Sequence, residues 1–185
     1  MKTTLKYIAS IQTGVFAKPI QKGEIVYFQA KHFDGNGELI EVLYPDLNAD
    51  NKTNKHLLKK GDVLFAAKGT KNFAAWYEDD EIPAVASTSF FVIRLIDKNV
   101  LSGYLTWFLN HPSTQILLKG HARGTSIASI SKAVLSELKI PIPDIRKQQL
   151  ILNIYKLRNK EKKLKQQIET LREKEIQQLL INAIK

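Results

Sequence analysis

Two polar stretches of this sequence carry the residue types that contact nucleic acid, and the first is 68–77 (KGTKNFAAWY). It combines lysine, threonine and asparagine with aromatic residues, directly after an apolar run. Lysine and threonine suit phosphate oxygens, and asparagine can form two hydrogen bonds with adenine in the major groove. The alternative is an ordinary polar turn, and for Phe73 and Trp76 we favour burial in a core. The candidate contacts are Lys68, Thr70, Lys71 and Asn72.

The second polar stretch, 121–131 (HARGTSIASIS), is rich in small hydroxyl residues. Such residues, together with glycine, allow a sugar-phosphate backbone to approach closely. An ordinary surface loop is the alternative interpretation. Lys18 and Lys22 extend the basic surface, although lysines of this kind commonly serve solubility alone. The candidates in the stretch itself are Arg123, Gly124, Thr125, Ser126 and Ser129.

The sequence offers no convincing set of catalytic or metal-binding residues. It has no cysteine, and its four histidines lie far apart without the spacing of metal ligands. The acidic run 78–81 (EDDE) could be a magnesium site, but consecutive carboxylates in a loop point in different directions, so we interpret it as a solvated loop. No nucleophile elbow, phosphate-binding loop or dinucleotide-binding fingerprint is present. We expect a non-catalytic protein without a metal or a cofactor.

The charge balance favours a polyanionic partner. The 185 residues include 28 lysines and arginines against 18 acidic residues, a net charge of +10. Residues 1–143 contribute 17 against 13 and residues 144–185 contribute 11 against 5, so the C-terminal part is the more densely basic. Clustered cations gain affinity for DNA by releasing counterions from its phosphates. Because no apolar run could span a bilayer and the N-terminus lacks a secretory signal, we expect a cytoplasmic protein.

The first hundred residues predict a small sheet of mixed or antiparallel strands. Residues 23–31 are rich in β-branched and aromatic types, and after a Gly/Asn/Asp loop residues 38–44 resume an apolar pattern, as in a hairpin. Further strands are predicted at 61–68 and 73–77. The run 83–95 is predicted as one buried strand.

From Ser102 the pattern changes to that of short helices. Ser102 is a candidate N-cap for a helix over 103–110. Pro112 suits the first turn of a second helix, which ends near Lys119.

The C-terminal part predicts one long helix. Ser131 is a candidate cap for a short helix before the extended segment 138–143. Asp144 is a candidate N-cap for the long helix, which can run on without a break because no glycine or proline occurs from 145 to 185.

An apolar stripe at coiled-coil spacing runs along this predicted helix, with Glu161 in one of its positions. A helix of roughly 60 Å, at about 1.5 Å per residue, cannot fold back along its whole length onto so small a domain. The stripe therefore predicts a second helix from another copy or another protein. Glu161, Glu175 and Gln178 would destabilise a tight parallel homodimer, which favours antiparallel or heterotypic pairing. The seam residues are Leu150, Ile154, Leu157, Leu164, Ile168, Leu171 and, after a slip of frame near Glu175, Leu179.

The order of these features resembles the specificity subunits of type I restriction-modification systems. In that family a target recognition domain ends in a Gly-Thr/Ser-rich loop, a short helix and an Ile-Pro-x-Pro segment. A long spacer helix that opens with glutamines comes next. The segments 61–70 and 104–110 are also similar to family features, and the resemblance covers nearly the whole chain. The residues that match the motifs are Gly124, Thr125, Ser126, Ile127 and Ile130, then 140–143, then Gln148 and Gln149.

The resemblance implies an α+β target recognition domain over 1–143, followed by a coiled-coil spacer helix over 144–185. The domain would contain a small mixed or antiparallel sheet and short helices. A full specificity subunit has two of each part, so the chain resembles a half subunit. Two copies would pair through antiparallel tail helices and present two domains to a split double-stranded DNA site with inverted halves.

The resemblance also implies partner subunits. An adenine methyltransferase would bind S-adenosylmethionine, and a restriction subunit would translocate and cut DNA. A non-catalytic, sequence-specific DNA binder is therefore the leading hypothesis. A coiled-coil adaptor with incidental basic charge is one alternative. The other is a nuclease acting through the acidic run 78–81, which metal-dependent cleavage by the isolated chain would support.

Overall fold

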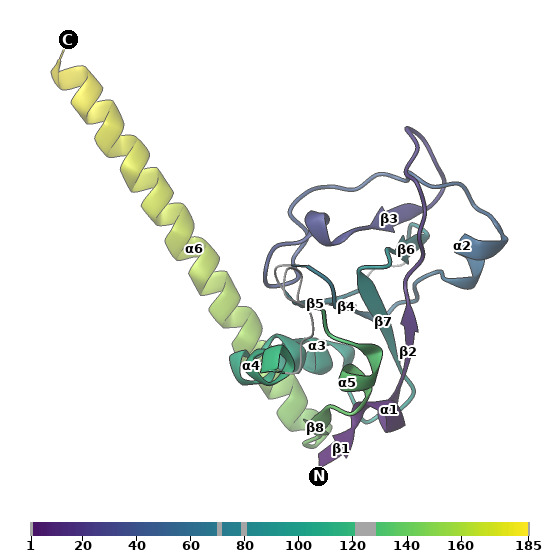
Figure 1. Ribbon diagram of the computed structural model, residues 1–185. Coiled ribbons are helices and arrows are strands. Elements are labelled where there is room, and N and C mark those ends of the chain that lie inside the picture. The colour runs from purple at the N-terminus through teal and green to yellow at the C-terminus, as the bar shows by residue number, and fades with distance from the viewer. Residues whose placement is uncertain (1, 70–71, 79–80, 121–128, 185) are drawn as a thin grey trace. The chain divides into compact units, whose positions relative to one another are not determined.

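The computed structural model describes residues 2–69, 72–78, 81–120 and 129–184 (Figure 1). The chain divides into two compact units, Met1–Gln148, which we call the head domain, and Gln149–Lys185, which we call the tail. This mixed α+β domain followed by a long helix confirms the predicted fold class. The elements in chain order are β1 (Lys2–Thr4), α1 (Leu5–Ile8), β2 (Ala9–Thr13), β3 (Val26–Phe28), the 3-10 helix η1 (Ala30–His32), α2 (Asn51–Lys55), β4 (Val63–Ala66), β5 (Ala74–Trp76), β6 (Ala84–Ala86), β7 (Phe90–Leu95), α3 (Ser102–Asn110), α4 (Pro112–Gly120), α5 (Lys132–Ser136), β8 (Lys139–Pro141) and α6 (Ile145–Ala183).

The centre of the head domain is a four-stranded sheet with the order β2-β7-β4-β5, in which all neighbours are antiparallel. Its strands are short runs of β-branched, aromatic and alanine residues, which pack well on a pleated surface. Helix α3 packs against β4 and β5. The parallel β3–β6 pair packs on the sheet through a buried apolar cluster that includes Val26, Phe28, Leu64 and Phe90. A third, two-stranded sheet pairs β1 with β8 and so joins the two ends of the head domain.

The predicted hairpin of 23–31 with 38–44 does not form as a pair of strands. Antiparallel pairing across its loop is limited to the bridge of Phe33 with Leu39, beside which the Ile40 N–H donates to the His32 carbonyl at 3.0 Å. β3 pairs in parallel with β6 instead, and 38–44 forms no strand. The other edge of β3 is occupied as well, because the Tyr27 N–H donates to the Asp46 carboxylate at 2.9 Å. With both edges taken, β3 cannot pair with 38–44, and Leu39 bridges to Phe33 instead.

The run 83–95 forms two strands rather than the single strand predicted. β6 and β7 belong to different sheets, and the turn between them consists of Ser87, Thr88 and Ser89. Gly14 lies directly against this turn, because a Cβ at that position would be 2.2 Å from the Ser87 carbonyl oxygen. The apolar runs on either side of these three hydroxyl residues, β6 and β7, therefore belong to two different sheets.

Three predicted helix starts are confirmed. Helix α4 begins at Pro112. Ser131 accepts a hydrogen bond from the Val134 N–H at 3.2 Å, and Asp144 accepts one from the Lys147 N–H at 3.0 Å. The second of these bonds holds the pKa of the Asp144 carboxyl below its ordinary value.

Ser102 is not the N-cap of α3, which corrects the prediction. Leu101 occupies that position without a side-chain cap. The Ser102 hydroxyl instead donates to the Gly61 carbonyl at 2.6 Å. This bond ties the start of α3 to the turn that precedes β4.

The outer edge of the sheet at β5 is closed by a side chain. The Asn110 Oδ1 accepts from the Ala74 N–H at 2.7 Å, and Asn110 Nδ2 donates to the Ala74 carbonyl at 2.8 Å. The amide at the end of α3 thus replaces a neighbouring strand. Covering an edge in this way prevents it from pairing with another chain.

The head domain includes the first turn of α6, where Gln148 is fully buried. Its Oε1 accepts from the Leu101 N–H at 2.9 Å, and its Nε2 donates to the carbonyls of Asn99 and Pro143, both at 2.8 Å. One amide therefore satisfies three backbone groups next to the starts of α3 and α6. Gln148 has a structural role.

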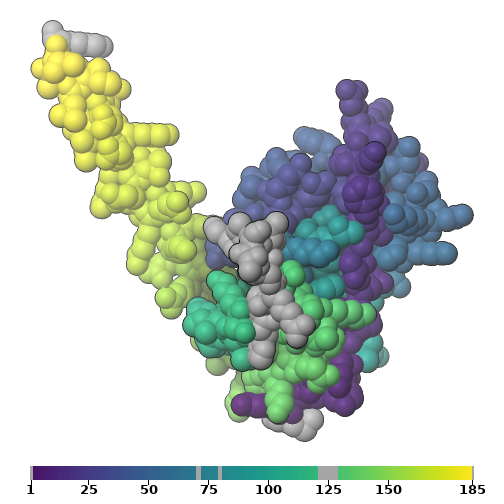
Figure 2. Space-filling model, in the orientation of Figure 1, coloured from purple at the N-terminus to yellow at the C-terminus, as the bar shows by residue number. Residues whose placement is uncertain are grey.

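The tail is one uninterrupted helix. α6 has 39 residues, which corresponds to roughly 60 Å at about 1.5 Å per residue. Figure 2 shows its side chains standing out around the helix. Glu161 forms an ion pair with Lys165 at 2.6 Å, which lowers the pKa of the Glu161 carboxyl. The predicted seam residues are all exposed, namely Leu150, Ile154, Leu157, Leu164, Ile168, Leu171 and Leu179.

Candidate nucleic-acid interface

The two polar stretches found in the sequence meet beside the turn between β4 and β5. Lys68 and Ser129 form an antiparallel bridge. The Ile130 N–H donates to the Ala67 carbonyl at 3.0 Å, and the Ile130 side chain is buried. Ile130 therefore anchors the end of the second stretch against the first.

A third polar segment, the turn Ser87–Ser89 between β6 and β7, belongs to the same place. The Ala67 N–H donates to the Ser89 carbonyl at 2.9 Å, and the hydroxyls of Ser87 and Ser89 lie 2.6 Å apart. Sequence reasoning missed this segment, although three consecutive hydroxyl residues inside an apolar run were the available signal. We call residues 67–69, 72–73, 87–89 and 129–131 the turn cluster.

The exposed groups of the turn cluster differ in what they can still bind. Lys68 is exposed, and Thr88 and Ser129 are partly exposed. Asn72 is partly buried, and its Nδ2 donates to the Ala66 carbonyl at 2.9 Å. Asn72 therefore supports the turn with one N–H, and within the described part of the chain no hydrogen bond uses its Oδ1 or its second N–H.

Gly69 gives the turn a backbone conformation that other residues rarely adopt. Its φ is +132°, and no described residue lies within 4 Å of where a Cβ would be. The glycine is required by the backbone rather than by crowding. Open space at this point allows another molecule to approach the peptide groups.

Six predicted contact residues lie outside the described residues. The structure describes the chain up to Gly120, the last residue of α4, and again from Ser129. Figure 2 shows α4 and α5, which flank this stretch, at the surface of the head domain. The six residues are Thr70, Lys71, Arg123, Gly124, Thr125 and Ser126.

Lys18 and Lys22 are exposed but belong to a different part of the head domain. Their segment is held by residues 45 and 46, since the Ile20 N–H donates to the Asp46 carbonyl at 2.8 Å and the Gly23 N–H donates to the Pro45 carbonyl at 3.0 Å. In Figure 1 this segment is the loop that joins β2 to β3. The structure does not bring these two lysines into the turn cluster.

The turn cluster is free of carboxylates. Its residues, as the structure describes them, include one lysine and five hydroxyl side chains but no aspartate or glutamate. Hydroxyls, backbone N–H groups and a lysine are the donors that proteins use on phosphate oxygens. The arrangement therefore suits a polyanion.

Glu78 and Glu81, the described ends of the acidic run 78–81, are not part of the turn cluster. Asp79 and Asp80 lie outside the described residues, and Glu78 and Glu81 line a pocket. Within the described ranges, no group of three or more histidine or acidic side chains could hold a metal ion. In the same part of the chain, no helix combines the length and the apolar character needed to cross a membrane.

Comparison with known families decides between the hypotheses. Residues 6–170 match the type I restriction modification DNA specificity domain. The chain belongs to this family. Specificity domains of this family serve DNA recognition and carry no catalytic activity and no cofactor of their own. No curated protein matches the chain significantly.

Solved specificity subunits share the fold of this specificity domain. The S subunit of the type I restriction-modification system from M. genitalium is 19% identical with a TM-score of 0.61, over 86% of this chain and 39% of that one. A chain from a structural study of complex assembly and conformational transition of the type I R-M system is 14% identical, with a TM-score of 0.63, over 87% and 38%. The HsdS subunit from Thermoanaerobacter tengcongensis is 12% identical, with a TM-score of 0.58, over 87% and 37%. The specificity domain thus spans at most 39% of these three longer chains.

Proposed function

We propose that this specificity domain reads double-stranded DNA sequence-specifically through the turn cluster, as a half specificity subunit that directs partner enzymes to a bipartite site. The observation that carries the proposal is the bridge between Lys68 and Ser129. It unites two stretches of candidate DNA contacts on a surface without carboxylates. The coverage of at most 39% of three solved chains supports a unit with one recognition domain and one spacer helix.

Different members of the turn cluster would contact phosphates and bases. Lys68, Thr88 and Ser129 offer a cation and small hydroxyl donors, which suit phosphate oxygens. The open backbone at Gly69 permits close approach. Asn72 can read a base edge with its Oδ1 and its remaining N–H, the pair of groups that matches adenine.

The other candidate contacts would add to DNA binding. Lys18 and Lys22 would contact phosphates on a flank of the site, where they contribute affinity without sequence information. Gly124 would let the backbone approach closely. The remaining candidates are Thr70, Lys71, Arg123, Thr125 and Ser126.

The tail would pair two copies in antiparallel orientation. Its exposed seam, from Leu150 to Leu179, provides an apolar stripe for a second helix. Antiparallel pairing gives a two-fold axis, so two head domains would face inverted half-sites. A helix of roughly 60 Å would separate the half-sites by more than one turn of DNA, which is about 34 Å.

The chemistry would come from partner subunits. An adenine methyltransferase would supply S-adenosylmethionine and the methyl transfer, and a restriction subunit would translocate and cut DNA. The specificity domain would contribute the recognition of the DNA site. This division of labour agrees with the family, whose domain is one of DNA specificity.

Salt-dependent binding to duplex DNA tests the recognition surface. We expect the purified chain to bind a fluorescent duplex with an affinity that falls steeply as salt rises, because phosphate contacts release counterions. Lys68→Ala and Arg123→Ala should each lower the slope of log affinity against log salt by about 1. Lys139→Ala, an exposed lysine on β8, is the matched control and should leave the slope unchanged.

Equal slopes for Lys68→Ala, Arg123→Ala and Lys139→Ala would contradict the assignment of the turn cluster. Binding that does not depend on salt would contradict DNA recognition as a whole. That second result would favour the adaptor hypothesis instead.

A further inference from the structure

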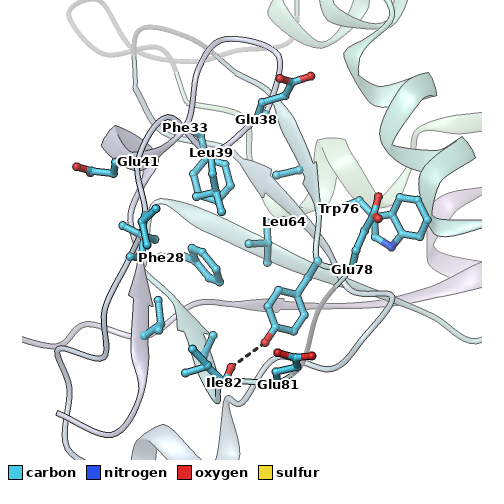
Figure 3. Close-up of a pocket in the computed structure, with 17 residues that line it drawn as sticks. Phe28, Phe33, Glu38, Leu39, Glu41, Leu64, Trp76, Glu78, Glu81 and Ile82 are labelled. Carbon is cyan, nitrogen blue, oxygen red and sulfur yellow. Dashed lines mark hydrogen bonds between the residues drawn. The ribbon is translucent and has the colours of Figure 1, made fainter. Parts of the chain in front are cut away.

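A half-open pocket of about 630 Å³ lies on the head domain and shares no residue with the turn cluster (Figure 3). Its lining comes from β3, β4, β5 and β6, from the irregular segment after η1 and from the described residues of the loop between β5 and β6. Phe28, Phe33 and Leu64 lie at its centre. The pocket thus offers an apolar floor built on the main sheet.

Four glutamates surround this floor, and among the described residues no lysine or arginine lines the pocket. Figure 3 shows Glu38, Glu41, Glu78 and Glu81 around the aromatic and aliphatic side chains. Such a concentration of carboxylates is unexpected in a chain with a net charge of +10. It repels phosphates and attracts cationic groups, so the pocket is not a DNA surface.

The apolar surface continues outside the pocket along the same irregular segment. Val42 and Leu39, which line the pocket, are 77% and 50% exposed. Their neighbours Ile40 and Tyr44 are 63% and 76% exposed. Contiguous exposed apolar residues beside a polar rim mark sites of protein interaction.

The backbone of this segment is also available. In the described part of the chain, residues 41–44 form no strand and make no backbone–backbone hydrogen bond. An extended peptide can pair with such a segment through main-chain hydrogen bonds, while a pocket next to it selects a side chain. The segment and the pocket are adjacent, because Glu41, Val42 and Leu43 line the pocket.

We infer that this pocket docks an extended segment of a protein partner in which a large apolar side chain is flanked by lysine or arginine. The apolar side chain enters the floor between Phe28 and Leu64. The flanking cations face Glu41 and Glu78, and the partner's backbone runs beside 41–44. This docking site lies outside the proposed DNA interface and does not depend on it.

The test uses the full chain and a phage-displayed library of random short peptides. We expect enrichment of peptides that combine lysine or arginine with leucine, phenylalanine or a similar side chain. The most enriched peptide, made with a fluorescent label, should bind about five- to tenfold more weakly to Glu41→Lys and to Glu78→Lys, because each change places like charges together. Glu137→Lys, the same change at an exposed glutamate outside the pocket, is the matched control and should bind normally.

Val42→Asp tests the apolar part without changing the core, since this side chain is exposed. It should also weaken the peptide about fivefold or more, while circular dichroism and the melting temperature stay those of the parent chain. No enrichment, enrichment of acidic peptides, or equal binding by Glu41→Lys and Glu137→Lys would each overturn the inference. Enrichment of peptides that match the chain's own tail would overturn it in favour of a second copy as the occupant.

Discussion

The head domain and the tail hold their apolar side chains in opposite environments. In α3 of the head domain, Leu105 and Leu109 are completely buried, whereas Leu157 and Leu164 of α6 are 68% and 49% exposed. Both helices have apolar residues at helical spacing. The difference is that α3 has a sheet to pack on. The head domain completes its own core, whereas the tail leaves its apolar side chains exposed, which fits the proposed pairing with a second helix.

The same substitution in the two regions should give the largest contrast. Leu105→Ala should lower the free energy of unfolding of the head domain by about 2–5 kcal/mol, because it leaves a cavity in a closed core. Leu164→Ala should leave that value unchanged and raise the dissociation constant for self-association. Denaturation followed by tryptophan fluorescence reports the head domain alone, since Trp76 and Trp107 both belong to it. Sedimentation measures the association.

A loss of head-domain stability in Leu164→Ala would break this contrast, because it would mean that the tail contributes to the same folding unit. Unchanged association in that variant would remove the tail as the pairing surface.

Ion pairs in the two regions should also differ in how much they contribute to the stability of the head domain, with the larger contribution from the pair in the head domain. Asp62 is 1% exposed and accepts from Arg94 Nε and Nη2 at 2.8 and 2.6 Å, bonds that raise the pKa of the Arg94 guanidinium. Asp62→Ala should cost the head domain about 2–3 kcal/mol, less than a fully buried pair because Arg94 is partly exposed. Glu161→Ala, which breaks the exposed pair with Lys165, should leave head-domain unfolding unchanged. Urea denaturation of both variants makes the comparison, and equal losses would contradict it.

Local signals predicted the parts of the fold that depend on neighbouring residues. The helix start at Pro112 and the caps at Ser131 and Asp144 follow from residue types close to each other in sequence. The long helix follows from the absence of glycine and proline after residue 144. Such signals act within one helical turn.

The wrong or missed features depend on partners far away in the chain. The parallel pairing of β3 with β6 excludes the pairing of 23–31 with 38–44 as strands. No residue pattern near 23–31 predicts this parallel pairing. The turn Ser87–Ser89 packs against Gly14, which is far away in the sequence. In the candidate site, the residue types single out Lys68 and Ser129 as candidate contacts, but their bridge is a tertiary contact that sequence spacing does not reveal.

Replacing a polar residue on the tail seam by an apolar one should strengthen self-association. Replacing a buried polar residue of the head domain should instead weaken the fold. Glu161 stands in the seam and is exposed in the single chain. Glu161→Leu should tighten self-association, because it completes the apolar stripe for a second helix. Sedimentation of this variant beside Lys162→Leu, its neighbour outside the stripe, measures the effect. Equal tightening by both variants would show that the stripe does not define the interface.

The smallest expected contrast concerns pH, because the tail contains none of the four histidines. Burial of His32, with Lys31 as a second cause, lowers the pKa of its imidazole, and Nδ1 accepts from the Gln29 N–H at 3.2 Å. A lowered folded-state pKa means that the unfolded chain takes up the proton first. The stability from neutral His32 is therefore present above the unfolded pKa of about 6.5 and is lost as the pH falls through the folded value.

We expect the melting temperature of the head domain to fall by a few degrees from about pH 7.5 to about pH 5.5, and His32→Gln to reduce this fall. The helix content of the tail should stay constant over the same range. Circular dichroism measures both, and an undiminished fall in His32→Gln would assign the effect to another group.

The central claim is that the head domain recognises a DNA half-site and that the paired tails set the distance between two half-sites. Selection of binding sites from a random duplex library by the purified chain tests it most directly. The account predicts two inverted half-sites whose centres lie more than one helical turn, about 10 base pairs, apart. The same half-site should remain, without its inverted copy, when Leu157→Glu and Leu164→Glu break the seam. A single continuous site in the parent chain, or no enriched sequence at all, would contradict the account.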